Sequence, residues 1–243
     1  MSSPTLQTPE PSSLFPTTLW TVLVDPVRRG GEDGTRALND LCRRYWLPIF
    51  TYVRSRGHDH HQAEELAQDF LAALIRRGSF QGLDREKGRF RAFLLVCLKN
   101  FLISQHEHKR AKKRGGGFDP CSLDELVDSV AYSVAPSDEV LFDRPWAETL
   151  LREALIRTEG EYQGAGKKES FEELRCFLTT GEPLKDRHEI ALKRGVEVGA
   201  VDVAIHRLRR RFGAILRALV AETVDSAEGL DAEMEYLISV ISA

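Results

Sequence analysis

The sequence predicts an all-α protein made of two small helical domains joined by an acidic flexible linker. Apolar residues recur at spacings of three and four through most of the chain, and no convincing alternation with a period of two is present. Three consecutive glycines, Gly115 to Gly117, follow a basic helical pattern, and such a run ends a helix. A chain of 243 residues is long enough for two small domains.

These signals divide the chain into five parts. The ranges are an N-terminal extension (1–34), a first helical domain (35–114), an acidic linker (115–145), a second helical domain (146–222) and an acidic C-terminal tail (223–243). The linker is expected to hold at most one short helix, near Leu123 to Val127. The tail has the pattern of an amphipathic helix, which we expect to pack internally; binding to a regulator is the alternative.

Three helices are expected in the first domain. The first has an apolar face from Leu38 to Val53 and ends at Gly57. The second runs from about Glu64 to Ile75, and the third from about Phe90 toward Arg114. Because the third helix is almost entirely apolar as far as Ile103, we expect it to be the buried centre of this domain.

In the second domain the spacing of small and apolar residues predicts a helix-turn-helix. Ala191 is followed four residues later by Gly195, and then by the apolar residues Val201 and Ala204. A small side chain is needed where the two helices cross, and a glycine suits the tight turn. The outward face of the second helix is predicted to carry Gly199, Asp202, Val203, His206, Arg207 and Arg210. A solvated helix with a basic end is the alternative.

Charge is strongly segregated along the chain. Residues 85–114 contain ten Lys and Arg against two Glu, whereas residues 118–143 contain seven carboxylates and no Lys or Arg. Around Phe90 the cations alternate with aromatic residues, a combination that suits single-stranded or melting DNA. We expect Phe90, Phe93 and Phe101 to lie mainly in the core, while the cations bind phosphates.

Three motifs together resemble the extracytoplasmic-function group of the sigma-70 family of RNA polymerase sigma factors. They are Ala63-Glu64-Glu65-Leu66-Ala67-Gln68-Asp69-Phe70, the segment Leu83 to Leu94 followed by Asn100, and His206-Arg207-Leu208-Arg209-Arg210-Arg211. The resemblance covers roughly residues 35–114, similar to sigma region 2, and 146–222, similar to region 4. The segment from Tyr162 to Gly181 is longer than the family pattern and has no assigned role.

The resemblance implies a role in promoter-specific transcription initiation, with core RNA polymerase and promoter DNA as partners. Contacts to the polymerase clamp are expected from Glu65, Gln68, Asp69 and Phe70. Contacts to the downstream promoter element are expected from Arg91, Asn100, Lys109, Arg110 and Lys113. The outward face of the helix-turn-helix would read the upstream element, although Asp202 and Val203 stand where family members often have cationic or polar residues.

Other functions are less consistent with the sequence. A stand-alone helix-turn-helix regulator leaves the basic helix and the acidic motif without a purpose, and an RNA-binding protein is a third possibility. No catalytic motif, metal site or cofactor site is recognised; Gly164 to Lys168 lacks the spacing of a phosphate-binding loop. Scattered cysteines and the lack of an apolar span predict a cytoplasmic protein, which we expect to be monomeric when free. The sequence does not say whether an anti-sigma factor binds it.

Overall fold

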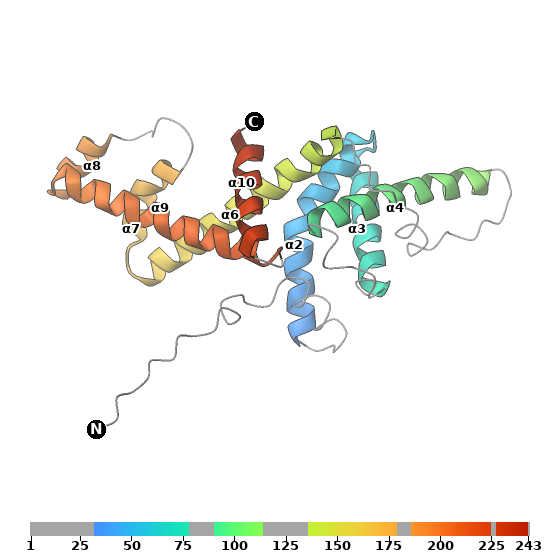
Figure 1. The fold of residues 1–243 in the computed structure, drawn as a ribbon, viewed down its shortest axis with the longest axis horizontal. Coiled ribbons are helices and arrows are strands. Elements are labelled where there is room, and N and C mark those ends of the chain that lie inside the picture. Colours follow the sequence, from blue (N-terminus) through green and yellow to red (C-terminus); the bar gives the residue numbers. More distant parts are fainter. Residues whose placement is uncertain (1–31, 78–89, 114–135, 179–185, 225–226, 243) are drawn as a thin grey trace, which may run out of the picture.

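The computed structural model describes residues 32–77, 90–113, 136–178, 186–224 and 227–242 (Figure 1). Within these ranges the regular elements are all helices, which confirms the predicted fold class. They are α2 (Glu32–Ser55), α3 (His60–Arg77), α4 (Phe90–Lys113), α6 (Pro136–Gly164), α7 (Lys168–Leu174), the 3-10 helix η3 (Arg175–Leu178), α8 (Arg187–Arg194), α9 (Val198–Ala221) and α10 (Ala227–Ser242). None of the described helices is long and apolar enough to cross a membrane.

Helices α2, α3 and α4 form the bundle expected for the first domain. In α2 the buried side chains of Leu41, Tyr45 and Ile49 follow the predicted spacing of four. Asp59 stabilises the start of α3, since its carboxylate accepts a hydrogen bond of 2.8 Å from the backbone N–H of Gln62. Leu94, Leu95, Cys97 and Leu98 of α4 are buried, so the apolar part of this helix lies in the core, as predicted.

Helix α6 corrects the predicted linker, because it begins at Pro136 and not near Trp146. Phe142, Trp146 and Leu150 lie four residues apart and are all buried in the first core. Pro136 fits the first helical position, where the missing N–H has no partner within the helix. Pro145, inside α6, removes only one helical hydrogen bond and does not stop the helix. The rest of the predicted linker lies outside the described residues.

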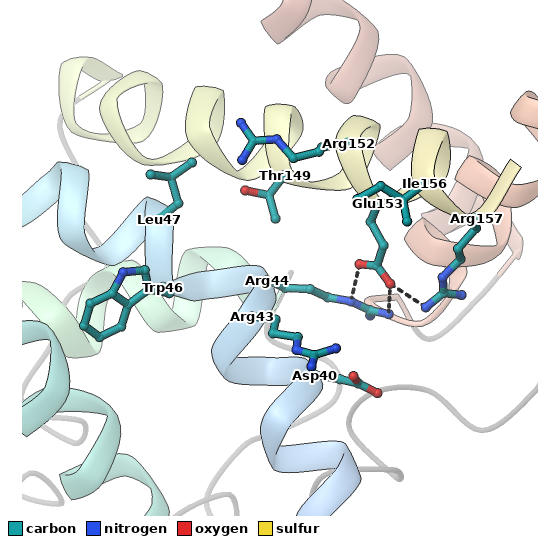
Figure 2. Close-up of a pocket in the computed structure, with 10 residues that line it drawn as sticks. All are labelled: Asp40, Arg43, Arg44, Trp46, Leu47, Thr149, Arg152, Glu153, Ile156 and Arg157. Atoms are coloured by element: carbon teal, nitrogen blue, oxygen red, sulfur yellow. Dashed lines mark hydrogen bonds and ion pairs between the residues drawn. The ribbon is translucent and has the colours of Figure 1, made fainter. Parts of the chain in front are cut away.

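Helix α6 packs along α2 (Figures 1 and 2). Arg44 of α2 is buried, and its guanidinium binds Glu153 of α6 at 3.1 Å. The same guanidinium forms an ion pair with Glu222, which follows the last residue of α9. One cation of the first domain therefore holds two elements from the second half of the chain.

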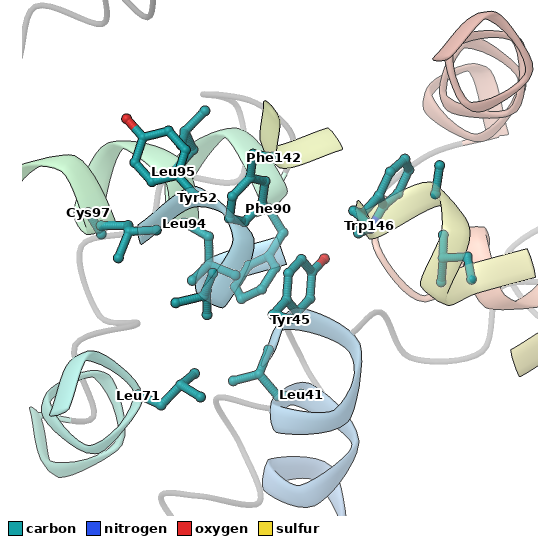
Figure 3. Packing of buried hydrophobic residues seen from close by; sticks show 14 of the residues in the cluster. Leu41, Tyr45, Tyr52, Leu71, Phe90, Leu94, Leu95, Cys97, Phe142 and Trp146 are labelled. Atoms are coloured by element: carbon teal, nitrogen blue, oxygen red, sulfur yellow. The ribbon is translucent and has the colours of Figure 1, made fainter. Parts of the chain in front are cut away.

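The first hydrophobic core extends well beyond the predicted first domain. It combines α2, α3 and α4 with α6, the C-terminal half of α9, and α10. Figure 3 shows part of this core, in which Trp146 of α6 lies near Tyr45 of α2. Leu230 and Leu237 of α10 are buried in it. The C-terminal tail therefore packs internally, as we expected.

A second, smaller hydrophobic core packs α7, η3 and α8 against the N-terminal half of α9. It consists of Phe171, Leu174, Phe177, Ile190, Ala191, Val201, Ile205 and Leu208, with Leu155 and Tyr162 of α6 packed against it. The segment without an assigned role thus supplies α7 and η3 to this core. Because α6 and α9 run through both cores, continuous helices connect the two helical units (Figure 1), whereas the sequence predicted a connection through a flexible linker.

The predicted turn lies between α8 and α9. Asp186 caps α8 by accepting a hydrogen bond from the backbone N–H of His188. Gly195 ends the helix with a φ of 62°, in the left-handed region that favours glycine. The N–H of Val196 donates to the carbonyl of Ala191 at 3.0 Å, which closes the turn.

The backbone conformation of Gly195 gives a first testable prediction. A Cβ at this position would meet no atom within 4 Å, so only the backbone conformation opposes a side chain. Gly195→Ala should lower the free energy of unfolding by about 1 kcal/mol, as measured by urea denaturation. Gly199 is an exposed residue of α9, and Gly199→Ala is the matched control. This substitution should leave the free energy of unfolding unchanged or raise it. An equal loss in both variants would contradict this explanation.

Candidate polymerase and nucleic-acid interface

The acidic motif forms an exposed face on α3. Glu65, Gln68 and Asp69 are exposed, and Glu65 lies 3.5 Å from the Nδ1 atom of His61 one turn earlier. Phe70 differs from our expectation: it is fully buried, and its ring centroid lies 5.5 Å from that of Phe101 in α4. In this structure Phe70 positions α3 on the bundle and does not offer its ring to a partner.

Arg91 is the largest departure from the predicted DNA-contacting set. Its side chain is only 6% exposed, and its Nε donates to Glu233 of α10 at 2.7 Å. A second guanidinium nitrogen, Nη1, forms an ion pair with Asp143 of α6. Arg91 therefore joins α4 to two helices from the second half of the chain and is not on the surface to meet DNA.

Two aromatic side chains complete the surroundings of Arg91. Its guanidinium lies 4.1 Å from the ring centroid of Tyr236 and 5.1 Å from that of Trp146. The hydroxyl of Tyr236 donates to Asp143 at 2.6 Å. Burial, with that hydrogen bond, raises the pKa of Tyr236 to about 12. Burial alone would lower the pKa of Arg91, but Glu233 and Asp143 more than offset this and raise it.

A second carboxylate of α6 binds cations from the first bundle. Asp138 lies in the first turn of α6, 2.8 Å from the Nζ of Lys99 in α4. It also forms an ion pair with Arg56, which follows α2. Burial alone would raise the pKa of Asp138, but the hydrogen bond from Lys99 and the charge of Arg56 lower it below its usual range.

The other residues predicted to contact the downstream element lie farther along α4. Asn100 is half-buried. Lys109, Arg110 and Lys113 belong to the last turns of the same helix, but their side chains lie outside what the structure describes. The exposed residues His106 and His108 precede them. The basic end of α4 therefore continues directly from the buried part of the same helix. The ion pairs of Arg91 fix the position of that buried part.

On α9 the predicted outward face is exposed. The stripe of Val201, Ile205 and Leu208 is buried, as expected. The exposed residues are Gly199, Asp202, Val203, His206, Arg207 and Arg210.

Not all of the charges on this face are free. Asp202 accepts a hydrogen bond of 3.1 Å from Arg187 of α8. Arg209 donates to the carbonyl of Phe177, and Arg211 binds Glu161. Arg209 and Arg211 are therefore held by partners within the protein.

The carboxylates that bind the first bundle were not identified from the sequence. Asp138 and Asp143 were assigned to the flexible linker, and Glu233 to the acidic tail. The helical spacing of Phe142, Trp146 and Leu150 was the available signal that this segment is helical. No signal within the sequence of α10 pairs Glu233 with Arg91, since the two residues are 142 positions apart.

Comparison with known proteins identifies part of the chain. Residues 41–114 match the family model described as sigma-70 region 2, a range that includes most of α2 and all of α3 and α4. No curated protein and no solved structure matches the chain. Residues 41–114 are therefore similar to sigma-70 region 2, and members of that family are non-enzymatic transcription initiation factors.

The buried ion pairs of Arg91 lead to a stability prediction. Arg91→Met keeps most of the apolar stem but leaves Asp143 and Glu233 without their cation, so unfolding should become easier by about 3–5 kcal/mol. Guanidinium denaturation followed by circular dichroism measures this change. Arg36→Met is the control, because Arg36 is exposed and, among the described residues, its ion pair is with Glu32; its effect should stay below about 1 kcal/mol. Similar effects of both substitutions would refute a structural role for Arg91.

Asp138 gives a prediction for the dependence of stability on pH. Its pKa is lower in the folded state, so its contribution is complete above the pKa of the unfolded state and is lost as pH falls through the folded-state pKa. As the pH falls from about 5 to about 2, the free energy of unfolding should therefore decrease less in Asp138→Asn than in the natural chain. Urea denaturation at each pH tests this, with Asp231→Asn as an exposed control. Parallel curves for the natural chain and Asp138→Asn would contradict the prediction.

Proposed function

We propose that this protein is a sigma factor that binds core RNA polymerase and directs it to specific promoters. The observation that carries the proposal is the match of residues 41–114 to sigma-70 region 2, which supports a role in promoter recognition and melting. In this proposal Glu65, Gln68 and Asp69 contact the polymerase clamp. The resemblance of the sequence motifs supports assigning the protein to the extracytoplasmic-function group, which is part of this proposal.

Downstream promoter contacts are proposed for the basic part of α4. Asn100, Lys109, Arg110 and Lys113 remain in this set, and Arg91 is removed from it. The buried ion pairs of Arg91 make it a positioning residue that holds α4 against α6 and α10. Phe90 and Phe101 of α4 are buried, so their rings stabilise the hydrophobic core.

Helices α8 and α9 are proposed to read the upstream promoter element as a helix-turn-helix. The exposed face of α9 supports this, because Arg207 and Arg210 lie near an uncharged surface formed by Gly199 and Val203. Val203 is 49% exposed, and an exposed valine in a major groove suits contact with the methyl group of thymine. The cations supply the phosphate contacts that any such reader needs.

A stand-alone helix-turn-helix regulator is the alternative function. The exposed face of α9 is compatible with it, because that face needs no conformational change to meet DNA. The two functions differ in their requirement for polymerase: a mobility shift with the free chain should show only weak, salt-sensitive binding if it is a sigma factor. We propose that the protein acts as a monomer in the cytoplasm.

The acidic face of α3 provides the first functional test. Asp69→Lys reverses an exposed charge and should abolish co-elution with core RNA polymerase on gel filtration, without changing the circular dichroism spectrum. Glu235→Lys reverses an exposed charge on α10 and is the matched control, which should co-elute normally. Normal co-elution of folded Asp69→Lys would remove that residue from the proposed interface.

The face of α9 provides the second functional test. Replacing both Arg207 and Arg210 with Ala should weaken promoter binding by the assembled polymerase and reduce the slope of log K against log salt by about two. Filter binding at several salt concentrations measures that slope. Replacing Arg36 and Arg144, two exposed arginines elsewhere, should leave it unchanged. An unaltered slope in the α9 variant would contradict the proposed phosphate contacts.

A further inference from the structure

An arginine-rich groove lies between α2 and α6 (Figure 2), and its lining includes none of the residues proposed to contact polymerase or DNA. Its volume is about 590 Å³. Four of its ten lining residues are arginines, namely Arg43, Arg44, Arg152 and Arg157. The lining carboxylates are Asp40 and Glu153, so the groove has an excess of two positive charges.

The four arginines fall into two pairs with different surroundings. Arg44 and Arg157 both bind Glu153, as the dashed lines in Figure 2 show, and are held in place by it. Arg43 and Arg152 are exposed and form no hydrogen bond or ion pair with the other residues described. They come from opposite walls, Arg43 from α2 and Arg152 from α6. In Figure 2 their guanidinium groups lie apart, on either side of the Arg44–Glu153 ion pair, so a ligand that reaches both must be an extended polyanion.

Part of the groove is apolar. Trp46, Leu47 and Ile156 contribute to the lining, and Ile156 is 60% exposed. The indole of Trp46 is stacked on Phe50, with centroids 6.5 Å apart and an interplanar angle of 11°, which orients the ring. An oriented aromatic ring beside guanidinium groups suits a ligand that combines a planar base with phosphates.

We propose that this groove binds a nucleoside triphosphate, with its phosphates on Arg43 and Arg152 and its base against Trp46. A volume of about 590 Å³ lies within the range of small-molecule sites. The proposal is independent of the proposed sigma function, because none of these residues belongs to any of the interfaces proposed above.

Binding in this groove would stabilise the contact between α2 and α6. A ligand that touches both walls binds the folded chain and not the unfolded one, so it raises the melting temperature as its concentration exceeds Kd. The same ligand should therefore be detectable by isothermal titration calorimetry and by thermal unfolding of the full chain.

The test uses guanosine and adenosine triphosphate, with inorganic triphosphate as the probe for phosphate alone. We expect at least one nucleotide to bind with a stoichiometry of one. The double variant Arg43→Ala, Arg152→Ala should weaken binding at least about tenfold. Trp46→Leu should weaken nucleotide binding without weakening that of inorganic triphosphate. The matched control, Arg36→Ala with Arg144→Ala, removes two arginines outside the groove and should bind as the natural chain does.

Three results would overturn the proposal. One is failure of both nucleotides to bind to the folded natural chain. Another is unchanged affinity in the Arg43 and Arg152 variant, since that would place the ligand elsewhere. The third is inorganic triphosphate binding as tightly as either nucleotide, which would leave no role for the base or for Trp46. Circular dichroism of each variant shows whether it is folded before its affinity is compared.

Discussion

The position of α4 depends on the buried guanidinium of Arg91. Taking a cation and two carboxylates out of water costs several kcal/mol per ion, and only close, well-aligned pairing offsets that cost. Arg91 meets Asp143 from α6 and Glu233 from α10 at the same place, so these three helices must come together with their charges aligned. Apolar packing alone tolerates many arrangements, whereas this network permits few.

Arg44 of α2 forms a second buried ion-pair network of the same kind. It joins Glu153 of α6 to Glu222 after α9, so both networks connect the bundle of α2, α3 and α4 to the C-terminal half of the chain. The two halves are therefore attached by ion pairs as well as by a shared apolar core. The acidic face of α3 and the outward face of α9 stay exposed, and the proposed function uses both of them together with the basic part of α4.

Local features were predictable from the sequence because they depend on residues close in the chain. The periodicity of α2 and α4, the buried stripe of α9 and the glycine turn at Gly195 all follow from spacing alone. Features that join distant residues were not predictable. Arg89-Phe90-Arg91 reads locally as a cationic and aromatic surface, but the partners of Arg91 lie 52 and 142 positions away. Pro145 and the nearby carboxylates suggested a linker, although the spacing of Phe142 and Trp146 favoured a helix.

Hydrogen exchange of the backbone amides tests the central claim most directly, because it reports how firmly α10 is attached to α4. The account predicts that amides near Glu233 in α10 are protected to a similar degree as amides in the buried part of α4, and that both lose protection together in denaturant. Exchange of the α10 amides at the rate of an unfolded peptide, while α4 stays protected, would contradict it.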